Sequence, residues 1–351
     1  MSNLDRAAPS ESMSNPLTKA LRNLAVQDYF IYAYLVVLLL ALRFGGAPAT
    51  GPKFDMGNGF SLPPIDRSAA YSVVLMDLGI LTTGILLSRG ELLPWLRLRG
   101  LAYRLGVFFP VLLSYFQLRL ILPAVTSRAL DEAIYRFDLN LFGFEPAVAW
   151  DRFVNPATTA WFGFFYFFYF FVLASHVIGF MLFSRRTSLL LEFSLGINIT
   201  FCVAHIIYMM VPGFGPFFHL RGTFVNDLEQ QGSFFYQFVA NAVRETGAMK
   251  DIFPSLHTGI PSYIAIFSFR HRDKLPFKYS WIVVALITSQ IIIATMFLRW
   301  HYLIDIFAGL TLATFANLAI GKIIPWEIQR RKREGLPPVF EQIRGDASPA
   351  D

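Results

Sequence analysis

Long apolar blocks alternate with shorter polar segments along most of this 351-residue chain. Most blocks approach the roughly 20 apolar residues that a membrane-spanning helix needs. A soluble protein with an unusually apolar core would not explain several such blocks with almost no charge. The pattern therefore predicts an all-α integral membrane protein with about eight transmembrane helices. The predicted spans are residues 28–43, 69–87, 105–122, 158–183, 188–211, 256–269, 281–297 and 302–320.

The polar segments divide the chain into five parts. Residues 1–27 lack a short apolar core followed by a cleavage site, so we expect a cytosolic tail rather than a signal peptide. Residues 28–123 hold the first transmembrane helices, and residues 158–323 hold a second set that carries the candidate chemistry. Residues 124–157 mix both signs of charge with Leu, Phe and Trp, which predicts short helices on the membrane surface. The basic residues 324–351 form a second cytosolic tail.

Composition agrees with this interpretation, since 55% of the residues are hydrophobic. The net charge of +6 does not indicate nucleic acid, because in a membrane protein the placement of basic residues sets the orientation. Most of the 30 Lys and Arg residues lie on the side that holds both termini, so we expect cytoplasmic termini. The single cysteine, Cys202, excludes an intramolecular disulfide framework and a cysteine-based metal cluster. We predict no metal and no cofactor.

Ionisable residues stand at the beginning of two predicted spans. His301 and Asp305 are four residues apart in the sequence HYLID and would share one helical face. His257 follows Pro254 and Ser255 in the sequence FPSLH, where a polar loop gives way to an apolar run. Ionisable groups at membrane depth are costly and usually face an interior site. The order of the spans places both histidines near the extracytoplasmic face.

These residues suit phosphoryl transfer without a metal. A helix N-terminus offers free N–H groups and a partial positive charge to a phosphate. Asp305 would orient the imidazole of His301 and leave its other nitrogen free to attack phosphorus. His257 would protonate the departing oxygen. From the residues alone, a purely structural role for His301 and Asp305 at a helix start stays open.

Two motifs resemble those of a known family. FPSLH at 253–257 and HYLID at 301–305 resemble the second and third motifs of the type 2 phosphatidic acid phosphatase superfamily. The HYxxD form is most similar to the branch of inositol phosphorylceramide synthases and, more distantly, of sphingomyelin synthases. The DLNLFG sequence at 138–143 is also similar to bacterial members of that branch. The resemblance implies a six-helix core, to which the N-terminal helices are additions.

The resemblance also implies the roles of three residues. The third-motif histidine, here His301, is the nucleophile, and Asp305 orients it. The second-motif histidine, here His257, acts as acid and base.

One departure from the broader superfamily concerns the phosphate-binding cations. That superfamily has an arginine six residues before the nucleophile, where this chain, like the synthase-like branch, has another residue, Thr295. A first motif of lysine and arginine is not recognisable either. The predicted substrate-binding residues are therefore Ser255, at a helix start, and three candidate cations, Arg299, Arg221 and Arg119.

The sequence thus predicts an enzyme that transfers a phosphate-containing head group between lipids through a phosphohistidine-type intermediate at His301. Its partners would be a phospholipid or lipid phosphate, a lipid or alcohol acceptor, and the membrane, without nucleic acid. A phosphatase acting on a lipid phosphate or prenyl diphosphate is the close alternative. Two further classes stay open. They are a non-catalytic lipid transporter or scramblase, and a glycosyltransferase with its key carboxylate at Asp55 or Asp66.

Overall fold

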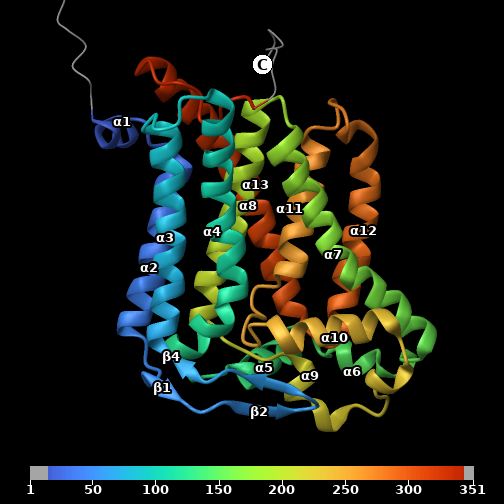
Figure 1. Cartoon of the computed structure of the whole chain (residues 1–351). Helices are drawn as coiled ribbons and strands as arrows, with labels where there is room; N and C mark the ends of the chain where they lie inside the picture. Colours follow the sequence, from blue (N-terminus) through green and yellow to red (C-terminus); the bar gives the residue numbers. More distant parts are fainter. Residues whose placement is uncertain (1–14, 344–351) are drawn as a thin grey trace, which may run out of the picture.

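A computed structural model describes residues 15–343 of the chain. Within the two predicted tails, residues 1–14 and 344–351 lie outside the described residues. Long helices stand side by side in a bundle, and short helices and two small sheets cover one end of it (Figure 1). The prediction of an all-α membrane protein is confirmed.

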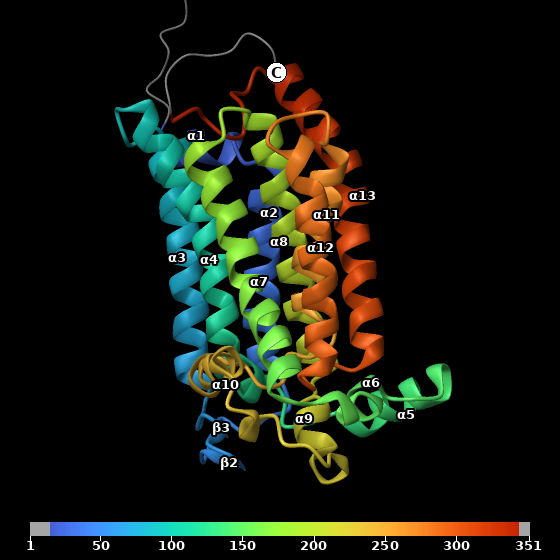
Figure 2. The same ribbon diagram turned by 90° about the vertical axis from the view of Figure 1, so that its right-hand side faces the viewer.

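Seven helices of the described chain are long and apolar enough to cross a membrane. They are α2 (Val26–Phe44), α3 (Arg67–Arg89), α4 (Leu96–Val125), α7 (Pro156–Phe183), α8 (Thr187–Met210), α12 (Phe277–Phe297) and α13 (Leu303–Arg333). The remaining predicted span is α11 (Leu256–Arg270), which stands within the bundle (Figure 2). Its 15 residues extend only about 22 Å, which is less than the hydrocarbon thickness of a bilayer.

The end of the bundle where α11 and α13 begin carries most of the short elements (Figure 2). The short helices there are α5 (Asp131–Phe142), α6 (Pro146–Ala149), α9 (Pro216–His219), α10 (Phe234–Thr246) and the 3-10 helices Asp151–Phe153, Arg221–Thr223 and Glu229–Gln231. The strands are β1 (Thr50–Gly51), β2 (Phe54–Gly57), β3 (Phe60–Leu62) and β4 (Ile65–Asp66), with antiparallel pairs β1–β4 and β2–β3. The sequence did not predict these strands, because such short runs show no usable alternation.

The opposite end of the bundle holds α1 (Pro16–Arg22) and the C-terminal part of α13 (Figure 2). The apolar run of α13 was predicted to end at residue 320, but the helix continues to Arg333. Its last turns are rich in Arg and Lys, which favour a helix also outside the membrane.

Helices α11 and α13 cross closely where the candidate residues lie. A Cβ atom on Gly309 of α13 would come within 2.5 Å of the carbonyl oxygen of Ser255, so only glycine fits there. The backbone N–H of Ser255 donates a hydrogen bond to the carbonyl oxygen of Asp305 (3.0 Å). Ser255 also caps α11, because its Oγ accepts a hydrogen bond from the Thr258 N–H (3.2 Å). The first turns that carry His257 and Asp305 are thus fixed against each other.

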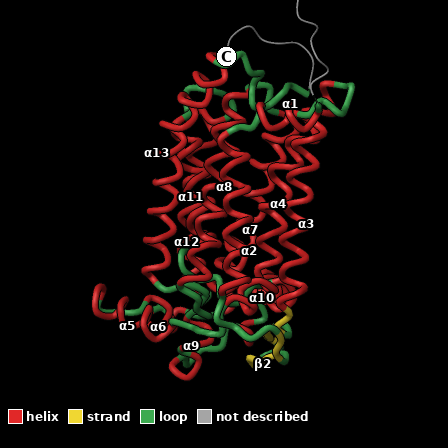
Figure 3. Tube along the Cα trace, turned by 90° about the vertical axis from the view of Figure 1, so that its left-hand side faces the viewer, coloured by secondary structure: helices red, strands yellow, loops and turns green. Residues whose placement is uncertain are grey.

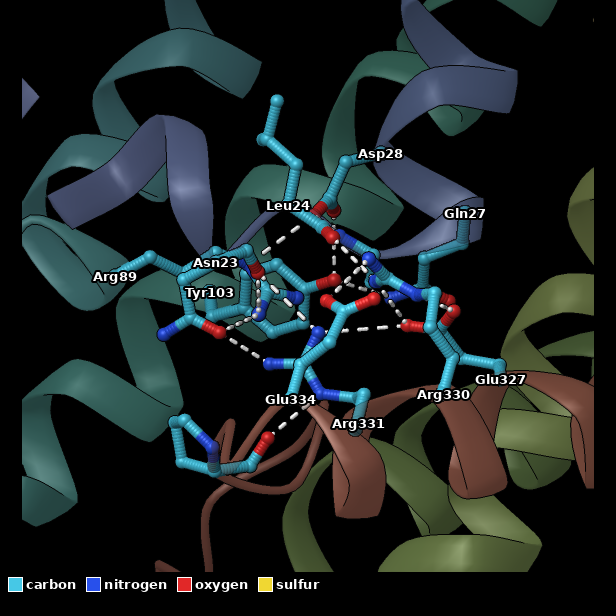
Figure 4. A network of polar contacts seen from close by, with 12 residues as sticks. Asn23, Leu24, Gln27, Asp28, Arg89, Tyr103, Glu327, Arg330, Arg331 and Glu334 are labelled. Carbon is cyan, nitrogen blue, oxygen red and sulfur yellow. Dashed lines mark hydrogen bonds and ion pairs between the residues drawn. The ribbon is translucent and has the colours of Figure 1, made fainter. Parts of the chain in front are cut away.

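A buried polar network joins the N-terminal helices to α13 (Figure 4), at the end of the bundle that holds α1 (Figure 2). Arg89 Nε lies 3.1 Å from Asp28 Oδ2, and both side chains are buried. The hydroxyl of Tyr103 donates to Asp28 Oδ1 (2.7 Å). Arg331 of α13 donates to the carbonyl oxygen of Asn23 (3.3 Å), which lies between α1 and α2. The C-terminal part of α13 is therefore attached to α2, α3 and α4.

Breaking this network is expected to reduce stability without a direct effect on catalysis. Asp28→Ala would leave the buried Arg89 guanidinium without its carboxylate, which typically costs about 3–5 kcal/mol. We expect a lower unfolding midpoint in detergent and an unchanged turnover per folded molecule. Glu91→Ala is the matched control, because the Glu91 carboxylate pairs with Lys19 and Arg99 at an exposed position, where each ion pair contributes about 0–1 kcal/mol. An Asp28→Ala protein as stable as the wild type would contradict a stabilising role.

Candidate active site

His257 and His301 line one cavity of about 80 Å³ at the end of the bundle that carries α10. His257 is the second residue of α11, and His301 lies two residues before α13. Loop segments enter this end of the bundle, between the helix ends above α10 (Figure 3). The two ring centroids are 6.3 Å apart, so a phosphate between the rings would be within reach of both.

His301 and Asp305 are in contact, although not within one helix as predicted. His301 Nδ1 lies 3.3 Å from Asp305 Oδ2, and both side chains are buried. Because α13 begins only at Leu303 and Tyr302 is its N-cap, His301 precedes the helix. Asp305 reaches back to it from the first turn, and its Oδ2 also accepts a hydrogen bond from the Tyr302 N–H (2.9 Å). With Nδ1 facing Asp305, Nε2 is the nitrogen that can attack a substrate.

The charge state of His301 suits a nucleophile. Burial lowers the pKa of His301 to about 4, and the negative charge of Asp251 partly opposes this shift. The ring is therefore neutral at physiological pH, and only the neutral imidazole has a free electron pair.

Asp251 is a cavity residue that the sequence analysis missed. Burial raises the pKa of its carboxyl, and His301 opposes that rise. The available signal was a carboxylate only two residues before the FPSLH motif.

Aromatic rings from α7 hold His257 in place. The ring of Tyr166 stacks on the imidazole with a centroid distance of 4.3 Å, and Tyr169 lies at the same distance on a tilted plane. The Tyr166 hydroxyl is 3.5 Å from His257 Nδ1. His257 Nε2 is buried and has no hydrogen-bond partner among the described residues. A ligand oxygen in the cavity would satisfy this nitrogen, as buried polar atoms normally require.

The remaining walls of the cavity are mostly aromatic and aliphatic. They include three tyrosines from different helices, of which Tyr115 belongs to α4, Tyr166 to α7 and Tyr208 to α8. Trp300, directly before His301, also lines the cavity. No lysine or arginine is among the described lining residues.

Two of the predicted cations, Arg299 and Arg221, lie in a different place. Arg299 is buried, pairs with Asp151 (2.6 Å) and donates to the carbonyl oxygen of Asn226 (2.6 Å). Arg221 donates to the carbonyl oxygen of Met56 (3.1 Å). Both arginines line a second, more polar cavity and not the one that holds the histidines.

The other two predicted substrate-binding residues, Arg119 and Ser255, lie next to the cavity but do not line it. Arg119 of α4 donates to the carbonyl oxygens of Gly247 (2.8 Å) and Ser61 (3.1 Å). Since Gly247 lines the cavity, Arg119 holds part of its wall. Ser255 is fully buried at the cap of α11 and does not line the cavity.

Two carboxylates of α5 fix the backbone around the site, a role that the sequence did not reveal. Asp131 accepts hydrogen bonds from the Gly215 N–H (2.8 Å) and the Tyr302 hydroxyl (3.2 Å). Asp138, from the DLNLFG sequence, accepts one from the Leu303 N–H (2.7 Å) and therefore caps α13. Burial raises the pKa of Asp138 to about 6, although the backbone N–H donors oppose the shift.

The carboxylates on which a glycosyltransferase would depend lie away from the histidines. Asp66 caps α3 by accepting a hydrogen bond from the Ala69 N–H (2.9 Å). Asp55, in β2, is exposed and accepts one from the Gly57 N–H (2.9 Å). Neither carboxylate lines the cavity of His257.

Comparison with known proteins agrees with the two motifs. A model of the PAP2 superfamily matches residues 132–319, more than half of the chain. The match contains His257, His301 and Asp305, and it leaves out α2, α3 and α4. No curated protein and no solved structure matches the chain.

Proposed function

Because the chain belongs to the PAP2 superfamily, whose members are generally phosphatases or phosphotransferases, we propose that it transfers a phosphate-containing head group between lipids. The observation that carries the proposal is the meeting of His257 and His301 at one cavity, with Asp305 against His301. The HYLID motif and Thr295 favour a relationship to inositol phosphorylceramide synthases within the superfamily. The basic loops favour cytoplasmic termini, which would place the site towards the extracytoplasmic face.

In the first step of the proposed reaction, His301 Nε2 attacks the phosphorus of a phospholipid. A P–N bond forms while the P–O bond to the departing lipid alcohol breaks, and His257, which has to carry a proton at this point, gives it to that oxygen. Asp305 stabilises the positive charge that develops on the His301 ring. The step leaves the phosphorylated head group on His301 and releases a lipid alcohol.

In the second step, the hydroxyl of a lipid acceptor attacks the same phosphorus. Neutral His257 takes the proton of that hydroxyl, a P–O bond forms, and the P–N bond to His301 breaks. Water in place of the acceptor would give hydrolysis, which is the second candidate function. The apolar lining, which includes Phe170, Phe214 and Phe218, supports a lipid acceptor because it excludes water from the site.

The charges of the cavity favour a donor that carries a single negative charge. The described lining residues include Asp251 but no lysine or arginine. A phosphodiester carries one negative charge at neutral pH, whereas a phosphate monoester carries up to two and is repelled more strongly by a carboxylate. These charges therefore support transfer from a phosphodiester lipid.

Asp251→Asn is expected to change the preference between these two donor classes. Removing the carboxylate should raise kcat/KM for a phosphate monoester lipid, relative to a phosphodiester lipid, by about tenfold or more. The measurement compares phosphatidic acid with phosphatidylinositol in mixed micelles. Glu245→Gln is the matched control, because it removes the same charge from an exposed position on α10, outside the cavity. If Asp251→Asn left the ratio of kcat/KM for the two lipids unchanged, the Asp251 charge would have no role in donor preference.

The proposed transfer is tested by lipid mass spectrometry on the purified protein in mixed micelles. The donor panel is phosphatidylinositol, phosphatidylcholine, phosphatidylethanolamine and phosphatidylglycerol, with ceramide and diacylglycerol as acceptors. A new head-group lipid made by the wild type and not by His301→Ala would support transfer. Release of a water-soluble phosphorylated head group, or of free phosphate from added phosphatidic acid, would support hydrolysis instead. Equal lipid profiles for the two proteins would contradict both functions and favour a non-catalytic lipid transporter.

A further inference from the structure

A groove between α7 and α12 opens at the end of the bundle opposite the catalytic cavity, and the two helices lie side by side in Figure 2. Its volume is about 540 Å³. Phe180 of α7 lines it and packs against Phe193 of α8 and Phe277 of α12, with centroid distances of 4.3 and 6.0 Å. At Gly179, an added Cβ atom would meet nothing within 4 Å. The apolar part of the groove is therefore open beside this glycine.

The rim of the groove is basic. Arg185 and Arg186, between α7 and α8, line it and are exposed. Within residues 15–343, neither guanidinium group forms an ion pair, and no Asp or Glu lines the groove. Two serines, Ser184 and Ser280, add hydroxyl groups to the same rim. The groove thus combines a mostly apolar interior, to which Ser175 and His176 also belong, with two cations at its mouth that form no ion pair within residues 15–343.

We propose that this groove binds an anionic phospholipid, with an acyl chain between α7 and α12 and the phosphate on Arg185 and Arg186. Burial of hydrocarbon against the phenylalanine side chains stabilises the chain. Two arginines that form no ion pair within residues 15–343 favour a head group with net negative charge, because basic side chains at the membrane surface attract anionic lipids. Guanidinium groups also bind phosphate oxygens in bidentate geometry.

This bound lipid is distinct from a lipid that reacts at His301. The catalytic cavity includes Tyr166, in the first half of α7, whereas Arg185 lies two residues after Phe183, the last residue of that helix. The lipid in the groove is therefore bound and not turned over. The proposal is independent of the reaction at His301, and it holds for either a transferase or a phosphatase.

Native mass spectrometry on the purified full-length protein tests this site, with phosphatidylglycerol and phosphatidylcholine as probes in matched micelles. The wild type is expected to retain phosphatidylglycerol in preference to phosphatidylcholine. In the double variant Arg185→Gln/Arg186→Gln, the retention of phosphatidylglycerol is expected to fall at least about tenfold, whereas the retention of phosphatidylcholine stays unchanged. Arg272→Gln/Lys274→Gln is the matched control, because it removes two charges at the same end outside the groove lining.

A second variant examines the apolar part of the groove without changing charge. Gly179→Phe would place a ring in the open space and is expected to reduce phosphatidylglycerol retention while both arginines stay. Because Gly179→Phe keeps both arginines, it still tests the groove if the double variant does not fold. Equal retention of the two probes by the wild type would overturn the proposal. The proposal would also be overturned if Gly179→Phe or a folded double variant retained as much phosphatidylglycerol as the wild type. It would be overturned as well if the Arg272→Gln/Lys274→Gln control lost as much phosphatidylglycerol as the double variant.

Discussion

Replacing His301 with alanine is expected to lower the rate of product formation by about 10⁴-fold or more. Alanine has no atom that can form the P–N bond, so neither half of the transfer can proceed through a covalent intermediate. In the variant, the acceptor would have to attack the donor lipid directly, without a covalent intermediate. The measurement is kcat for the wild type and the variant, with the best donor and acceptor of the lipid panel.

A second histidine serves as the control for this loss. His219 lies at the same end of the bundle, is exposed, and contacts Glu132 at 3.1 Å, but it does not line the cavity of His257 and His301. His219→Ala should therefore have nearly wild-type activity. A folded His301→Ala protein with a nearly wild-type rate would show that another group attacks phosphorus.

Replacing His257 with alanine is expected to lower kcat by about 10²- to 10⁴-fold with a phospholipid donor. The departing lipid alkoxide is a strong base and leaves slowly without a proton, and His257 is the group placed to supply it. A phosphodiester with a nitrophenol leaving group needs little protonation, so the variant should lose much less activity with that donor. The two donors are compared by single-turnover rates, which isolate the first step.

The pattern of loss distinguishes proton transfer from a structural role of His257. Tyr169→Phe keeps a ring against His257 and removes only a hydroxyl, so it should reduce both rates little. Equal losses with the two donors in His257→Ala would contradict proton donation, because a misplaced α11 would affect both reactions alike.

The helices could be predicted from the sequence because the bilayer dictates the length of an apolar run. The predicted spans coincide with the observed helices to within a few residues at most ends, as at Leu256, the predicted and observed start of α11. The extension of α13 to Arg333 was missed, because a helix that leaves the membrane no longer needs apolar residues. The strands of residues 50–66 were missed because each is only two to four residues long.

The candidate site was predictable from the sequence only where its contacts are local. The contact of His301 with Asp305 is local, so spacing alone was enough to suggest it. The phosphate-binding cations could not be predicted in this way, since nearness in sequence does not give the direction of a side chain. Arg299 is two residues from His301, yet its guanidinium pairs with Asp151. Asp251 belongs to neither motif, and although it lies two residues before FPSLH, its place in the cavity is seen only in the fold.

The N-terminal helices had no role that the sequence could suggest. In the structure, α4 contributes Tyr115 to the cavity and holds Gly247 through Arg119. The buried pair of Asp28 and Arg89 belongs to the network that attaches α13 (Figure 4). Helices α2, α3 and α4 lie outside the family match, but α4 forms part of the wall of the candidate site.

A phosphorylated head group on His301 is the most direct consequence of the proposed transfer. The wild-type protein would be incubated with the donor lipid in the absence of acceptor, quenched at alkaline pH to preserve a phosphohistidine, digested and analysed by peptide mass spectrometry. We predict a mass increase equal to the phosphorylated head group on His301, which disappears when the acceptor lipid is added. Turnover with an unmodified His301, or with the head group on another residue, would contradict the proposed mechanism.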